Sequence, residues 1–243
     1  MDKNVIITGA SRGIGAATAK LLAAKGYGVC INYRSRSQDA EQVLAAIRAA
    51  GGRAMALAAD VSVEEEVTRL FEAAEAQLGP VTHLVNNVGI LATQSPLVDI
   101  SLERFNHILT TNVTSCFLCS REAARRFEAG GAIDNVSSAA ARTGAPNEYV
   151  DYAASKGAMD SLTLGLAKEL APKGIRVNAV RPGLIHTEIH ADGGEPGRVD
   201  RLASRIPLGR GGDPEEVANA IAWLLSDEAS FVTGSLLDVA GGF

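Results

Sequence analysis

A tyrosine and a lysine stand four residues apart in the stretch YVDYAASKGAMDSL, residues 149–162. The stretch is rich in Ala, Ser, Lys, Met and Leu, and no proline occurs before Pro172, which predicts a helix. Residues i and i+4 share one helix face, so the phenol of Tyr152 and the ammonium of Lys156 are neighbours. A nearby cation favours the phenolate, and we expect Lys156 to lower the pKa of Tyr152 from about 10 towards neutrality. The pair is a candidate for proton transfer.

Tyr149 is a second phenol on the same helix face. It lies seven residues before Lys156, about 10.5 Å away along the helix axis, which is beyond hydrogen-bonding reach. We therefore expect Tyr149 to form a pocket wall or to pack at the helix start. The side chains around the Tyr152–Lys156 pair are small enough to admit a ligand; they are those of Ala153, Ala154, Ser155 and Gly157.

A glycine-rich loop is the second chemical signal. Gly9, Gly13 and Gly15 follow a β-rich run at 4–9 and open a helical run at 16–26. Glycines in this position permit a tight turn and let a pyrophosphate approach the N–H groups at a helix start. The spacing G-x-x-x-G-x-G differs from the generic G-x-G-x-x-G fingerprint, so the place of the loop after the first strand carries the inference.

Strand-like and helix-like runs alternate along the chain. Strands are expected at 4–9, 27–34, 53–60, 81–89, 132–138, 175–183 and 235–242. The main helices between them are expected at 16–26, 39–52, 62–79, 112–127, 149–162 and 213–227. This alternation predicts an α/β fold in which residues 1–243 form a single doubly wound Rossmann-type domain. Its seven-stranded parallel sheet would carry helices on both faces.

Local signals refine three of these elements. Ser62 and Glu65 have the spacing of a capping box at the start of the helix at 62–79. Asp213 is the expected cap of the late helix, with Pro214 at its first position. Asp134 stands where an apolar residue is expected in the fifth strand. Because a buried carboxylate needs a partner, we expect a strand-edge location with access to solvent for Asp134.

Composition excludes several classes of protein. The chain has 243 residues, of which 47% are hydrophobic and 21% charged, and its formal net charge is -5. Acids and bases are interspersed, which predicts no nucleic-acid partner. No apolar run approaches the ~18 residues of a membrane span, and the N-terminal stretch lacks the pattern of a signal peptide. We therefore expect a cytoplasmic protein without a membrane partner. Free Cys30, Cys116 and Cys119 are expected to be structural, because the C-x-x-C pair has no second pair or nearby histidine.

Six motifs occur in a fixed order along the chain. They are Thr8-Gly9-x-x-x-Gly13-Ile14-Gly15, Asn86-Asn87-Val88-Gly89, Asn112, Ser137-Ser138, Tyr152-x-x-x-Lys156 and Pro182-Gly183-x-x-x-Thr187. Over essentially its full length the chain resembles the short-chain dehydrogenase/reductase family, and within it the branch of 3-oxoacyl-carrier-protein reductases and glucose-type 1-dehydrogenases. The resemblance implies an NAD(P)-dependent oxidoreductase that interconverts a carbonyl and a secondary alcohol by hydride transfer. Candidate substrates are 3-oxoacyl thioesters and sugars.

The resemblance also implies a catalytic set. Tyr152 would supply a proton to the carbonyl oxygen, Lys156 would hold the nicotinamide ribose, and Ser138 would orient the substrate oxygen. Asn112 would hold a water and a main-chain carbonyl near the lysine. Ser138 precedes Tyr152 by fourteen residues, where the family usually has thirteen, so Ser137 remains an alternative. Because successive side chains of a strand point to opposite faces, only one of the two serines can face the cofactor, and we favour Ser138.

The end of the second predicted strand favours NADP over NAD. An acidic residue there would bind the adenosine ribose of NAD, but the chain has Asn32, Tyr33 and Arg34. Arg34, together with Arg12 in the glycine loop, would suit a 2′-phosphate. By resemblance, the cofactor-binding residues are Gly9, Ser11, Arg12, Gly13, Ile14, Gly15, Tyr33, Arg34, Asp60, Val61, Asn87, Val88, Gly89, Tyr152, Lys156, Pro182, Gly183, Ile185 and Thr187.

Residues 184–208 occupy the place of the family's mobile substrate lid. Polar residues in this segment, among them His190 and Arg198, would favour a hydroxylated or charged substrate. His186 and His190 are four residues apart, but the glutamate between them does not fit H-E-x-x-H, and we expect no metal. By analogy with the family we expect a homotetramer that acts on a small molecule. The competing hypothesis is a non-catalytic sensor or scaffold that binds NAD(P).

Overall fold

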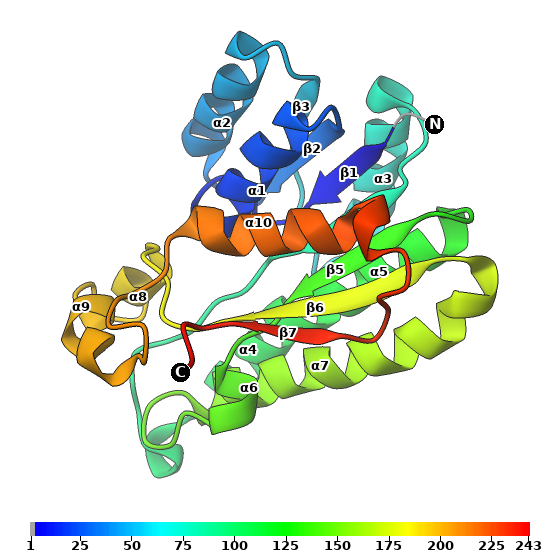
Figure 1. The fold of residues 1–243 in the computed structure, drawn as a ribbon. Helices are drawn as coiled ribbons and strands as arrows, with labels where there is room; N and C mark the ends of the chain where they lie inside the picture. The colour runs from blue at the N-terminus through cyan, green and yellow to red at the C-terminus, as the bar shows by residue number, and fades with distance from the viewer. Residues whose placement is uncertain (1–2) are drawn as a thin grey trace.

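Seven parallel strands form one sheet at the centre of the protein (Figure 1). The computed structural model describes residues 3–243. Across the sheet the order is β3 (Ala54–Ala58), β2 (Gly28–Tyr33), β1 (Asn4–Ile7), β4 (His83–Asn86), β5 (Ala132–Val136), β6 (Arg176–Pro182) and β7 (Leu236–Val239). This arrangement confirms the predicted doubly wound Rossmann-type sheet.

Helices cover both faces of the sheet, so its inner strands are buried on both sides and read as apolar runs. One face carries α1 (Gly13–Ala24), α2 (Ser37–Ala49) and α10 (Pro214–Leu225). The other carries α3 (Glu64–Leu78), α5 (Ser115–Arg126) and α7 (Val150–Leu170). Each set of helices encloses its own apolar core against the sheet.

Shorter helices lie mainly in the connections. They are α4 (Leu102–Leu109), the π-helical turn η2 (Thr110–Thr114), α6 (Ala140–Thr143), α8 (Ile189–Asp192) and α9 (Arg198–Leu202). The 3-10 turns are η1 (Leu97–Asp99), η3 (Ala171–Lys173), η4 (Ala203–Arg205) and η5 (Asp227–Ala229). Figure 1 shows α8 and α9, in gold and orange, beyond the ends of β6 and β7 and on the same side as the C-terminus. Within residues 3–243, no helix has both the length and the apolar character required to cross a membrane.

The sheet order reverses direction between β1 and β4. β1 pairs with β2 on one side and with β4 on the other, and the chain winds outward in both directions from there. In an open parallel sheet, such a reversal leaves a crevice at the carboxyl ends of the strands, where ligands bind. The loops that follow β1, β4 and β5 all line this crevice.

Asp134 lies in the interior of the sheet, so the expected strand-edge location is wrong. Its strand β5 pairs with β4 and β6, where Asp134 is opposite Val85 and Asn178. The residue is 0% exposed, and neither carboxylate oxygen has a hydrogen-bond partner in the described part of the chain. Desolvation raises the pKa of Asp134 well above its usual value, and the charge of Arg176 offsets this only in part.

The predicted capping box at Ser62 and Glu65 does not form. Helix α3 begins at Glu64, and the Ser62 hydroxyl donates instead to Asp60 Oδ1 at 2.6 Å. The N-cap residue is Val63, and Glu66 in the first turn accepts from the backbone N–H of Asp60 at 2.6 Å, which ties the preceding loop to the helix. At α10 the prediction was right: Pro214 is the first helical residue, and Glu216 accepts from the backbone N–H of Asp213.

Candidate active site

A cavity of about 620 Å³ lies at the carboxyl ends of the strands. Its wall joins the glycine loop after β1, the ends of β2, β4, β5 and β6, the start of α7 and the segment that carries α8 and α9. Every predicted site residue except Gly15 and Asn112 lies on this wall. Motifs that are up to about 180 residues apart therefore meet in one place, in a volume that suits a bound small molecule.

The glycine loop is shaped for a close approach of a ligand to the backbone. Gly9 and Gly13 have φ angles of 62° and 53°, which disfavour other residues. Gly15 lies behind the wall, where an added Cβ would stand 2.6 Å from Asn87 Nδ2. That same Nδ2 donates to the carbonyls of Thr8 and Gly9 at 2.9 and 3.0 Å. Asn87 thus fixes the loop from the neighbouring strand end.

The two arginines predicted to bind a 2′-phosphate have different partners. Arg34 is 60% exposed in its side chain, and its Nη1 lies 3.7 Å from Asp60 Oδ2. Burial opposes ionisation of Asp60, but hydrogen bonds from Ser62 and the charge of Arg34 outweigh burial and lower the pKa of Asp60. Arg12 instead forms an ion pair with Asp192 at the end of α8. Just after β2, Arg34 and Arg36 both lie on the cavity wall, and Arg36 is paired with Asp39.

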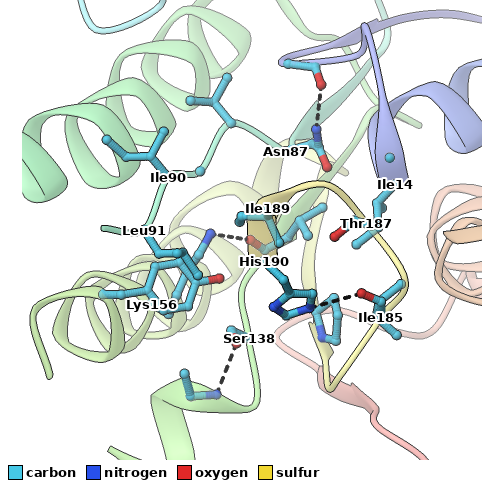
Figure 2. A pocket seen from close by; sticks show the side chains of 18 of the residues that line it. Ile14, Asn87, Ile90, Leu91, Ser138, Lys156, Ile185, Thr187, Ile189 and His190 are labelled. Carbon is cyan, nitrogen blue, oxygen red and sulfur yellow. Dashed lines mark hydrogen bonds between the residues drawn. The ribbon is translucent and has the colours of Figure 1, made fainter. Parts of the chain in front are cut away.

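Tyr152 and Lys156 lie together on the first turns of α7. Lys156 is 2% exposed, and its Nζ lies 5.6 Å from the centre of the Tyr152 ring. The Nζ donates to the carbonyl of Val136 at 2.8 Å, a contact drawn in Figure 2. The hydrogen bond to Val136 therefore fixes the ammonium of Lys156 to the end of β5, and the ammonium is not hydrogen-bonded to the phenol.

The pKa of Tyr152 moves opposite to the prediction. Burial raises it to about 12, and the hydrogen bond with Ser138 offsets only part of that rise. Burial also lowers the pKa of Lys156 to about 8, because the charged ammonium loses water. The Nζ of Lys156 bonds to Val136 and not to the phenol, so its charge does not reverse the effect of burial on the pKa of Tyr152. Near neutral pH the phenol is thus protonated and the lysine is mostly cationic.

The two candidate serines have different environments. The Ser137 hydroxyl donates to the carbonyl of Lys156 at 3.2 Å, so it is directed at the backbone of α7. Ser138 accepts from the N–H of Ala140 at 3.1 Å, and its hydroxyl also interacts with the phenol of Tyr152. Figure 2 shows Ser138 on the cavity wall. Both serines line the cavity, and Ser138 is the one that interacts with the phenol of Tyr152.

Asn112 lies behind the cavity, in the π-helical turn η2. It is 0% exposed, its Oδ1 accepts from the N–H of Ile90 at 2.8 Å, and its Nδ2 donates to the Ile90 carbonyl and to Ser155 Oγ, each at 3.0 Å. The side chain therefore ties the loop after β4 to α7. A Cβ added to the adjacent Gly89 would stand 3.1 Å from Lys156 Nζ, so this loop also limits where the ammonium can lie.

Several residues on the wall were not identified from the sequence. They include Arg36, Leu91, Thr143, Glu148 and Phe243. The loop 143–149 contains Gly144, Ala145 and Asn147 with φ angles of 75°, 43° and 61°, and left-handed backbone is uncommon for the last two residue types. The G-A-P-N run and the extra residue between Ser138 and Tyr152 were the signals that could have predicted this loop.

The segment 184–208 covers the cavity from one side. Leu184, Val199, Leu202 and Ile206 form a separate apolar cluster in it. A Cβ added to Gly193 would stand 2.1 Å from Leu91 Cδ1, and Gln94 Nε2 donates to Glu195 at 2.5 Å. The segment thus rests against the loop after β4. Across residues 3–243, no group of three or more His, Cys, Asp or Glu is placed to hold a metal ion.

Comparisons with known proteins identify the family. The family model described as enoyl-(acyl carrier protein) reductase matches residues 9–243. The chain is 57% identical over 242 residues to the uncharacterized oxidoreductase YgfF of Escherichia coli, with 98% of each chain covered. The chain belongs to the short-chain dehydrogenase/reductase family. It is therefore an NAD(P)-dependent oxidoreductase.

Other members of this family have named activities or bound cofactors. Glucose 1-dehydrogenase 2 of Bacillus subtilis is 38% identical over 99% of this chain and 94% of its own length. 3beta-Hydroxysteroid dehydrogenase 1 of Eggerthella lenta is 43% identical over 99% of this chain and 93% of its own length. A Burkholderia cenocepacia short-chain dehydrogenase, solved in complex with NADP, superposes with a TM-score of 0.91 at 36% identity, covering 99% and 97% of the two chains. The relatives thus differ in substrate on one shared fold.

Proposed function

We propose that this short-chain dehydrogenase/reductase uses NADP to interconvert a carbonyl and a secondary alcohol, with Tyr152 as the proton donor or acceptor. The observation that carries the proposal is the placing of Tyr152, Lys156 and Ser138 on the wall of the cavity that also contains the glycine loop. A non-catalytic sensor would have no need of a buried ammonium and a half-buried phenol side by side next to its cofactor. The substrate remains a small carbonyl compound, such as a sugar or a 3-oxoacyl thioester.

The residues present fit a bound dinucleotide phosphate. The glycine loop leaves no room for a Cβ at Gly15, and the start of α1 lies on the cavity wall, as a pyrophosphate site requires. Arg34 would hold the 2′-phosphate, because a guanidinium matches phosphate oxygens and its side chain is exposed. Lys156 would hold ribose hydroxyls. When bound, NADPH supplies the hydride that the carbonyl carbon receives.

The protein's own residues manage the proton. In the reductive direction the phenol of Tyr152 gives its proton to the carbonyl oxygen as the carbon receives the hydride, which yields the alcohol and a phenolate. The cationic Lys156, 5.6 Å from the ring centre, stabilises that phenolate. Ser138 holds the substrate oxygen within reach of the phenol. Asn112 acts as a positioning residue, because it fixes the loop at Ile90 against Ser155 of α7.

Cofactor choice is tested by titrating NADPH and NADH against the wild type, Arg34→Ala and Arg48→Ala. Nicotinamide fluorescence reports the binding. Arg48 is an exposed arginine on α2, away from the cavity wall, and serves as the matched control. The proposal predicts that the wild type binds NADPH more tightly than NADH. The NADPH affinity should fall by about tenfold or more in Arg34→Ala and should be unchanged in Arg48→Ala. Equal binding of both cofactors by all three proteins would contradict it.

Turnover is tested by supplying NADPH with a panel of ketones, sugars and acyl thioesters and following nicotinamide oxidation and alcohol formation together. Alcohol formed in equal amount to the NADPH consumed supports the reductase. Tight NADPH binding without turnover of any carbonyl, or of any alcohol with NADP, would favour the sensor.

The proposal extends to the lid and the assembly. Residues 184–208 would open and close over the substrate, and the protein would work as a cytoplasmic homotetramer. Support for assembly comes from exposed apolar side chains on α5 and α7, Phe117 and Leu164. An added Cβ at Gly157 or Gly165 of α7 would meet nothing within 4 Å, so another helix could approach closely there. Light scattering tests the state directly: four chains of 25.2 kDa are expected.

A further inference from the structure

Two residues of the cavity wall each have a buried polar atom without a partner within residues 3–243. The atoms are the hydroxyl of Tyr149 and Nδ1 of His190. Tyr149 is 4% exposed and His190 is 8% exposed, so water does not readily replace a missing hydrogen bond. Buried polar groups in native proteins are nearly always bonded, and an exception at a cavity calls for a ligand that supplies the bond.

The hydrogen-bonding character of His190 is fixed by its other nitrogen. Nε2 lies 3.1 Å from the carbonyl oxygen of Ile185, which can only accept, so Nε2 carries the hydrogen. Burial lowers the pKa of His190, and the ring is neutral near pH 7. Nδ1 is therefore an acceptor. In Figure 2 the dashed bond runs from one ring nitrogen of His190 to Ile185, and the other ring nitrogen lies on the opposite side of the ring.

Tyr149 is held from two sides. The guanidinium of Arg198 lies over its ring at 5.2 Å from the ring centre. The preceding loop turns through left-handed backbone at Ala145 and Asn147, and the N–H of Tyr149 donates to the Ala145 carbonyl at 3.0 Å. Such backbone persists only where the surrounding structure enforces it, and it collects at ligand sites. The ring is fixed while its hydroxyl is left without a partner.

The charged groups beside these two residues are already paired. Arg198 Nη1 donates to Glu148 at 3.2 Å and to Glu195 at 3.0 Å, and its Nη2 also binds Glu148. The side chain of Arg198 is 10% exposed. The charge of Arg198 is thus paired, and next to it the cavity wall has a neutral imidazole at His190 and a neutral hydroxyl at Tyr149. Those groups match a substrate hydroxyl better than a carboxylate or a phosphate.

We infer that the substrate carries a hydroxyl group in addition to the carbonyl that is reduced, and that His190 Nδ1 accepts from this hydroxyl while the Tyr149 hydroxyl supplies the second contact. The substrate class is thus a neutral hydroxyketone or hydroxyaldehyde, and a diol in the oxidative direction. This inference rests on the proposed carbonyl reduction. An analogue without the hydroxyl leaves both protein atoms buried and unpaired, which is how polar sites discriminate most strongly.

The test compares matched substrates of equal size with NADPH as the cofactor. The 2-, 3- and 4-hydroxycyclohexanones are each paired with the methylcyclohexanone substituted at the same position, and a cyclohexanone carboxylate serves as the charged probe. For the wild type we expect kcat/KM to favour at least one hydroxy ketone over its methyl partner by about tenfold or more. Tyr149→Phe and His190→Phe should reduce that ratio towards one. His190→Asn, which keeps an acceptor near the position of Nδ1, should retain part of it.

Tyr27→Phe is the matched control, because it removes a buried tyrosine hydroxyl remote from the cavity and should leave the ratio unchanged. Wild-type turnover of the methyl ketones at least as fast as the hydroxy ketones would overturn the inference and leave the proposed function standing. Preference for the carboxylate would overturn it in favour of recognition by the exposed Arg205 on the cavity wall. Bound NADPH with no turnover in the whole panel would overturn both the inference and the proposed function.

Discussion

The ammonium of Lys156 lies 5.6 Å from the ring centre of Tyr152 but gives its hydrogen bond to the carbonyl of Val136, 2.8 Å away. Both groups belong to the first two turns of α7, and Val136 ends β5. The lysine is thus fixed to the sheet within electrostatic reach of the phenol. Burial keeps the phenol protonated in the free enzyme, and the fixed lysine leaves a cation within reach of the phenolate that the proposed proton transfer would form.

Removing the phenol hydroxyl should abolish proton transfer without weakening cofactor binding. For Tyr152→Phe we expect kcat to fall by about 10²–10⁴, the usual contribution of a positioned acid or base. NADPH affinity, measured by nicotinamide fluorescence, should change less than about threefold, because the ring remains. The same measurement on Tyr27→Phe, the tyrosine remote from the cavity, should give wild-type values. A near-normal kcat in Tyr152→Phe would mean that another group supplies the proton.

The pH dependence of reduction should follow Lys156. Its pKa of about 8 means that the ammonium is present below pH 8 and is lost as the pH rises through that value. The Tyr152 phenol keeps its proton up to about pH 12, so it does not cause the fall. We expect kcat/KM for carbonyl reduction to decline above about pH 8, and we expect Lys156→Arg, whose charge persists, to move the decline upward. An unchanged profile in Lys156→Arg would assign the titration to another group.

Asp134 should cost stability at neutral pH. Its pKa is raised in the folded state, so the native protein holds a proton that the unfolded chain releases. Stability attributable to this group is therefore greatest below the unfolded pKa and declines as the pH rises towards the folded pKa. Asp134→Asn cannot ionise, and we expect it to raise the free energy of unfolding at pH 8 by about 1 kcal/mol or more, with little gain at pH 4.

Urea denaturation at the two pH values measures this difference. A variant that is less stable than the wild type at both would mean that the carboxylate has a partner which the amide cannot replace.

The contact between the lid and Leu91 should control substrate affinity. A Cβ at Gly193 would stand 2.1 Å from Leu91 Cδ1, whereas one at Gly197 would meet nothing within 4 Å. Gly193→Ala should therefore keep the segment 184–208 from closing and raise the KM for the carbonyl substrate by roughly threefold or more. Gly197→Ala is the matched control on the same segment and should leave KM unchanged. Equal KM values for both variants would mean that the lid does not close at this contact.

Much of the fold follows from local patterns. The alternation of strand-like and helix-like runs predicted the parallel sheet, because apolar strands between amphipathic helices bury both sheet faces. Tyr152 and Lys156 were predicted together, because their spacing on one helix decides which side chains meet. Gly9 and Gly13 were predicted to form a pyrophosphate-binding loop because they directly follow the first strand.

The rest depends on tertiary context. The sequence near Asp134 does not reveal that β5 is an inner strand, and its burial depends on how β4 and β6 pair with it. The expected fall in the Tyr152 pKa assumed a phenol in water beside a lysine, but burial and the Val136 carbonyl decide both protonation states. Asn112 was predicted to hold a water and a main-chain carbonyl near the lysine, but the sequence did not indicate the π-helical turn that directs its amide to the Ile90 carbonyl.

The central claim is that this cavity passes a hydride to a carbonyl while Tyr152 passes the proton. The most direct test is a single-turnover reaction of a hydroxy ketone with NADPH in which both hydrogens at nicotinamide C4 are deuterium, with mass spectrometry of the product. The account predicts an alcohol with one deuterium on the carbinol carbon from the wild type, and almost none from Tyr152→Phe despite bound cofactor. Product without deuterium, or equal product from both enzymes, would contradict it.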